Sequence, residues 1–183
     1  MATISVGQVK VTRSFAMTVK TKKKPVQAPP QLQVENLGVK PTNGFDFFVF
    51  NEQTVVSANI RQIWPEFNRN FFGHIERDVQ PAKVVVSRLK SNHHGDISRV
   101  LREIKLAQFV TLIESQRAGQ DYLLNINGRN NIAKIVDSKN ESRIVIVRWM
   151  GAGNCKKFWS IDSIPVSGLS YLQEGICILS PAR

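Results

Sequence analysis

The C-terminal third of this chain of 183 residues alternates short apolar segments with turn residues, and this pattern constrains the fold more than any other feature. Asn127-Gly128 lies between two apolar runs, which is a strong signal for a β-hairpin. The polar residues 137–142 and the glycine-rich residues 151–154 mark further turns. The segments between the turns, which we predict to be strands, are 122–126, 132–136, 143–149, 156–161 and 175–179. Short strands at roughly ten-residue spacing indicate a small β-barrel or a meander.

The order of motifs within this region resembles the small SH3-fold barrels of the Tudor and chromo type. The resemblance rests on the motifs Ala133-Lys134-Ile135-Val136-Asp137, Val145-Ile146-Val147-Arg148-Trp149, Gly151-Ala152-Gly153, Lys157-Phe158-Trp159 and Ile164-Pro165. It implies a binding module for nucleic acid or protein and brings no catalytic residues with it. It is confined to the C-terminal third, and we find no family resemblance in residues 1–120.

Further strands are predicted in the N-terminal half of the chain. Residues 9–20 alternate apolar and polar positions, which is typical of a half-buried strand. Residues 45–50 and 83–89 are apolar enough to be buried strands. Residues 54–57 are the expected hairpin partner of the first of these two segments.

A short helix is predicted between Trp64 and Gly73, with Pro65 in its first turn. Its aromatic side chains recur at helical spacing, a pattern that is more typical of a core than of a surface for base stacking. We therefore assign to the core the aromatic set Trp64, Phe67, Phe71 and Phe72.

A longer amphipathic helix is predicted over residues 97–118, because apolar residues form a broad band at helical spacing. Asp96 precedes it as an N-cap, and Gly119 ends it. Leu101 and Ile104 lie in the middle of the apolar band, so we expect both side chains in the core. The sequence thus predicts an α+β protein. It has a β-rich N-terminal part (1–95), a central amphipathic helix (96–119) and a small SH3-like β-barrel or meander (120–183).

The charge balance predicts a polyanionic partner. The chain carries 25 Lys and Arg against 14 Asp and Glu, a formal net charge of +11, and the excess is spread over its whole length. Lys22, Lys23 and Lys24 begin a proline-rich segment, 21–31, that cannot hold regular structure. We interpret this segment as an exposed basic loop, which serves either as an arm contacting phosphates or as a solvated connector.

In the C-terminal third, basic residues are interleaved with aromatic ones. Alternate residues of a strand share a face, so Lys157 and Trp159 are expected on one face and Lys156 and Phe158 on the other. A face that carries a cation and an aromatic ring suits phosphate contact together with base stacking. The alternative is a core tryptophan beside solvated lysines. The candidate nucleic-acid-binding residues are Lys22, Lys23, Lys24, Arg143, Arg148, Lys156, Lys157 and Trp159.

The motifs for catalysis and for metal binding are weak. The glycine-rich turn lacks the remaining residues of a phosphate-binding loop, and Glu103-Ile104-Lys105, the residue order of many nucleases, falls inside the predicted helix. Adjacent histidines such as His93-His94 rarely chelate one ion. Two distant cysteines exclude a disulfide framework and a cysteine-based zinc site. We expect no metal, no cofactor and no catalytic residue.

These observations favour a non-enzymatic nucleic-acid-binding protein, with DNA and RNA both open as partners. One alternative is a structural or assembly subunit of a ribonucleoprotein, a capsid or a phage-encoded complex. Another is a metal-dependent enzyme that acts on nucleic acid. The longest apolar runs are far shorter than a membrane helix requires, and residues 1–20 do not form a signal peptide. We therefore expect a cytoplasmic, reducing location without a membrane partner.

Overall fold

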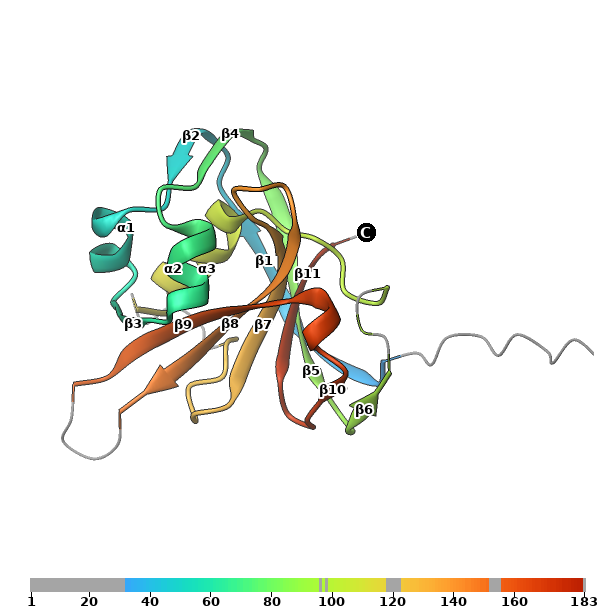
Figure 1. Cartoon of the computed structure of the whole chain (residues 1–183). Coiled ribbons are helices and arrows are strands. Elements are labelled where there is room, and N and C mark those ends of the chain that lie inside the picture. Colours follow the sequence, from blue (N-terminus) through green and yellow to red (C-terminus); the bar gives the residue numbers. More distant parts are fainter. Residues whose placement is uncertain (1–31, 96, 98, 118–122, 152–155, 183) are drawn as a thin grey trace, which may run out of the picture.

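The computed structural model describes residues 32–95, 97, 99–117, 123–151 and 156–182. These residues form a strand-rich α+β structure, which confirms the predicted fold class (Figure 1). The predicted strand 9–20, the loop 21–31 with its three lysines, Asp96 and Gly119 lie outside the described residues. None of the helices in the described ranges is long and apolar enough to cross a membrane.

One seven-stranded sheet organises the molecule. In spatial order its strands are β1 (Val34–Thr42), β5 (Ala82–Leu89), β11 (Cys177–Pro181), β7 (Asn130–Val136), β8 (Ser142–Met150), β9 (Phe158–Pro165) and β3 (Ile60–Ile63). β7, β8 and β9 are consecutive and antiparallel, so they form the predicted meander. β11 continues it on one side and β3 on the other, both through parallel pairing, and the meander does not close into a barrel.

Strands that are far apart in the sequence meet in this sheet, because β11 also pairs antiparallel with β5. Two small sheets flank it, one formed by β2 (Phe45–Val49) with β4 (Ile75–Val79) and one by β6 (His93–His94) with β10 (Tyr171–Leu172). The helical elements are α1 (Glu52–Ser57), α2 (Pro65–Phe71), α3 (Leu106–Arg117) and a 3-10 turn at Val166–Gly168.

The sheet buries side chains on both faces, and alternate residues of its central strands belong to two hydrophobic clusters. On one face, Ala133 and Val145 belong to a large cluster that includes buried side chains of α2 and α3. Figure 1 shows where these two helices lie beside the sheet. On the other face, Ile132 and Ile144 pack in a smaller cluster with Ile97, Leu101, Leu172 and neighbouring residues. We call these the helix-side face and the opposite face of the sheet.

Residues 54–57, expected to be a strand, belong to the helix α1. Asn51 is the reason, because its side-chain oxygen accepts a hydrogen bond from the Thr54 backbone N–H at 3.1 Å and caps the helix. The partner of β2 is therefore β4. The helix predicted between Trp64 and Gly73 is confirmed as α2, which begins at Pro65.

The predicted helix over 97–118 begins only at Leu106. The residues before it run beside the end of β7, where Glu103 forms a bridge with Lys134 and the Ile104 N–H donates to the Lys134 carbonyl at 3.0 Å. That hydrogen bond holds the segment in an extended path. Leu101 and Ile104 are nevertheless buried, as predicted, although they belong to different clusters.

Residues 123–129 form a loop and not the predicted first strand of a hairpin. Side-chain amides form hydrogen bonds with the backbone of this loop. Asn131 Oδ1 accepts from the Asn125 N–H at 2.6 Å, and Asn131 Nδ2 donates to the Asn125 carbonyl at 3.1 Å. Asn125 Nδ2 in turn donates to the Gly175 carbonyl at 2.8 Å. Both sides of β7 are already occupied by β8 and β11, so no position in the sheet remains for this segment.

We expect Leu101→Ala to lower the free energy of unfolding by about 2–3 kcal/mol. Leu101 is 4% exposed and packs in the cluster on the opposite face. The cost lies toward the lower end of the usual range because Leu101 also borders an open depression that water can enter. Urea denaturation measures this, with Arg102→Ala at the exposed neighbouring position as the control. A neutral Leu101→Ala would contradict the assigned packing.

Candidate nucleic-acid interface

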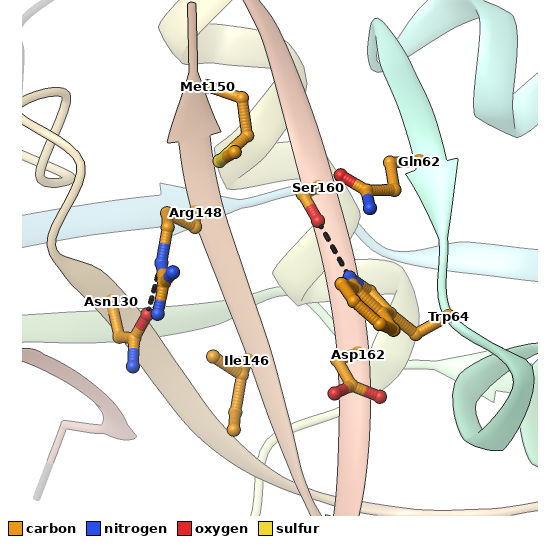
Figure 2. Close-up of a pocket in the computed structure, with 8 residues that line it drawn as sticks. All are labelled: Gln62, Trp64, Asn130, Ile146, Arg148, Met150, Ser160 and Asp162. Atoms are coloured by element: carbon orange, nitrogen blue, oxygen red, sulfur yellow. Dashed lines mark hydrogen bonds between the residues drawn. The ribbon is translucent and has the colours of Figure 1, made fainter.

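A depression of about 220 Å³ lies on the opposite face of the sheet, over strands β7, β8, β9 and β3 (Figure 2). The strand register explains which residues line it. Arg148 on β8 is the register partner of Asn130 on β7 and of Ser160 on β9, and Ser160 is in turn the partner of Gln62 on β3. Partners in register share a face of the sheet, so their polar side chains form one row. The residues that line the depression are Gln62, Trp64, Asn130, Ile146, Arg148, Met150, Ser160 and Asp162.

Hydrogen bonds hold the largest side chains around the depression. The Trp64 indole N–H donates to Ser160 Oγ at 3.1 Å, while the Trp64 backbone N–H donates to the Ile161 carbonyl at 3.0 Å. Across the depression, Arg148 Nε donates to Asn130 Oδ1 at 2.9 Å (Figure 2). Trp64 remains 48% exposed. The site therefore presents a fixed aromatic ring and a fixed guanidinium to solvent on facing sides.

Further positive charges lie beside this site, at the edge of the sheet formed by β3 and β9. Lys156 and Lys157 are exposed just before β9, and the Lys157 carbonyl accepts from Asn59 Nδ2 at 2.9 Å. The exposed Arg61 donates from Nε to Asn59 Oδ1 at 3.3 Å. Asn59 thus links the backbone of Lys157 to the side chain of Arg61 beside β3, the strand at this edge of the sheet.

Of the predicted binding residues, Arg148 is exposed on β8, and Lys156 and Lys157 are exposed just before β9, the strand that pairs with β8. Lys22, Lys23 and Lys24 lie outside the described residues. The assignment of Arg143 needs correction, because it is buried near the other end of β8. Its Nε donates to Asp137 Oδ2 at 2.6 Å, and Glu141 lies 3.4 Å from its Nη2. This guanidinium holds the 137–142 turn and is not available to phosphate.

The stacking role predicted for Trp159 is wrong, since its side chain is 0% exposed. The ring packs against Trp149 with 4.7 Å between ring centroids and belongs to the cluster on the helix-side face. The exposed aromatic residue that lines the depression with Arg148 is Trp64. The assignment of Trp64 and Phe72 to the core is therefore wrong, whereas Phe67 and Phe71 are buried as predicted. Pro65 is the sequence feature that could have indicated an exposed Trp64. A proline at the first helical position leaves Trp64 as the N-cap, outside the buried stripe of Phe67 and Phe71.

Several carboxylates elsewhere in the described ranges are engaged in structural contacts. Glu103-Ile104-Lys105 is extended and not helical, but the Glu103 carboxylate accepts from Ser142 and lies 3.4 Å from Lys134 Nζ. The hydrogen bond from Ser142 and the charge of Lys134 hold the pKa of Glu103 below its usual value, against the effect of burial. Within the part of the chain that is described, no three His, Cys, Asp or Glu side chains are grouped so that they could hold a metal ion.

Comparison with protein families, with curated proteins and with solved structures finds no match for this chain. The resemblance to Tudor and chromo barrels therefore stays a prediction.

Proposed function

We propose that this protein binds nucleic acid through the sheet face around Trp64 and Arg148 and does not catalyse a reaction on it. The observation that carries the proposal is the pairing of a half-exposed, hydrogen-bonded tryptophan with an exposed arginine on facing sides of one depression. Bases stack on exposed aromatic rings, and guanidinium groups contact phosphate.

The charge around the depression supports the same function. Lys156, Lys157 and Arg61 lie along the neighbouring sheet edge, and the whole chain carries a net charge of +11. A polyanion that tracks this edge would release counterions on binding, and its affinity would fall as salt is added. A sheet face that combines stacking with such a basic border is a common platform for single-stranded nucleic acid.

Replacing Arg148, Lys156 and Lys157 together with alanine is expected to weaken binding to all sequences and to make it less sensitive to salt. Each neutralised phosphate contributes about 0.7–0.9 to the slope of log affinity against log salt, so the slope should fall by about two to three units. Fluorescence anisotropy with labelled DNA and RNA oligonucleotides, measured between about 50 and 200 mM salt, gives both quantities.

The matched control replaces Lys83, Lys90 and Lys139 with alanine. These lysines are exposed on β5, just after β5 and in the turn before β8, away from the depression, and the variant loses the same net charge. Its affinity and salt slope should stay close to those of the unmodified protein. If the two triple variants behave alike, this face is not the site. The assembly-subunit alternative then gains support, and a large nucleic-acid-free complex on size exclusion would favour it.

A further inference from the structure

Two opposite charges line the depression without pairing with each other. Arg148 on β8 is opposite Ser160, whereas Asp162 on β9 is opposite Ile146, the next residue pair on the same face. In the described ranges neither side chain belongs to an ion pair. Both therefore have hydrogen-bonding capacity left for a bound molecule.

The carboxylate of Asp162 limits what can lie next to it. An ionised carboxylate only accepts hydrogen bonds, and it repels phosphate and carbonyl oxygens. Its Oδ1 already accepts from the Ser163 backbone N–H at 2.7 Å, which leaves Oδ2 to the ligand. The part of the ligand beside Asp162 must then be an N–H or O–H donor, and any phosphate must lie toward Arg148 and the lysines.

The shape of the depression selects a flat, partly apolar group. Trp64 and Asp162 lie on its β9 side, and Arg148 and Ile146 lie on its β8 side (Figure 2). Ile146 and Met150 supply apolar surface, while the bond to Ser160 fixes the indole of Trp64. A planar ring stacked on Trp64 can thus turn one edge toward Asp162 while its attached phosphate points to the basic side.

We infer that the depression takes one unpaired nucleobase that carries an exocyclic amino group, an inference that rests on the proposed function. The amino group of adenine or cytosine donates to an aspartate, whereas uracil and thymine present a carbonyl oxygen at the corresponding position. A base inside a duplex has no exposed ring face to offer Trp64, so the ligand is single-stranded. Asp162 is then the residue that determines base preference.

The test measures the affinity of the full chain for oligoadenylate, oligocytidylate and oligouridylate of equal length at one salt concentration. The unmodified protein should bind the adenine and cytosine oligomers roughly tenfold more tightly than the uracil oligomer. In Asp162→Asn the amide both donates and accepts, so the three affinities should fall within about twofold of one another. Loss of a negative charge raises all three affinities together. The ratio of the affinities for the adenine and cytosine oligomers to that for the uracil oligomer is therefore the quantity that tests the role of Asp162.

Asp46→Asn is the matched control, because Asp46 is exposed on β2 and the variant makes the same change of charge. It should keep the preference of the unmodified protein. Equal affinity for the three oligomers, or a preference that survives in Asp162→Asn, would overturn the inference and leave the proposed function in place. Failure of the unmodified protein to bind any oligonucleotide would overturn the proposed function itself.

Discussion

Trp159→Ala should lower the free energy of unfolding by about 3–5 kcal/mol. The Trp159 side chain is fully buried, and it packs on Trp149 within the cluster that joins the helix-side face to α2 and α3. Truncation removes the largest fully buried side chain among the described residues and leaves a cavity that the neighbouring side chains fill only in part. Denaturant unfolding followed by circular dichroism measures the loss.

Two further tryptophan variants separate packing from binding. Trp159→Phe should lower the free energy of unfolding much less than Trp159→Ala does. Phenylalanine keeps most of the packing, and the change removes an indole N–H that has no acceptor among the described residues. Trp64→Ala should cost only about 1 kcal/mol, since it removes a neutral hydrogen bond from a half-exposed site. It should instead weaken binding to single strands about tenfold. A stable Trp159→Ala variant with impaired binding would show that the two tryptophans have been assigned the wrong way round.

Glu76→Ala is expected to lower the free energy of unfolding by about 3–5 kcal/mol, because α3 loses the group that satisfies its first turn. Glu76 on β4 is buried, and its two carboxylate oxygens accept from the Leu106 and Ala107 N–H groups at 3.0 and 2.9 Å. Hydrogen bonds to a charged group contribute about 1.5–3 kcal/mol each, and the positive end of the helix dipole adds to them. Leaving two donors buried without an acceptor is correspondingly costly.

The same carboxylate makes stability depend on pH. Burial raises the pKa of Glu76, but the side chain of His74 and the Ala107 and Leu106 N–H groups lower it by more, so the folded-state pKa lies below the usual value. Its contribution is therefore complete above the unfolded-state pKa of about 4.3 and is lost as the pH falls through the lower folded-state value.

Glu76→Gln isolates this contribution from those of other carboxylates. The unmodified protein should be more stable than the variant at neutral pH, and the difference should shrink steadily below about pH 4.3. Chemical denaturation of both proteins between pH 7 and about pH 3 gives the difference directly. A difference that does not change with pH would contradict an ionised Glu76 at the start of α3.

Local sequence patterns determined most of the sheet and the short helix. Alternating apolar residues and polar turns predicted the meander of β7, β8 and β9, and proline at the first position predicted α2. These features depend on neighbours in the chain, so a local pattern contains the necessary information. The excess of basic residues, from which a polyanionic partner was inferred, is likewise a property of the sequence alone.

Only the tertiary structure decided where α3 begins and which tryptophan reaches the surface. The start of α3 depends on Glu76, which is thirty residues away from Leu106 in the chain, and on the pairing of Glu103 with Lys134. Period-two alternation predicts which side chains of β9 share a face with Trp159, but it does not reveal that α2 and α3 cover that face. Alternation determines which side chains share a face. Which face is then buried depends on the elements that pack against the sheet, and these come from distant parts of the chain.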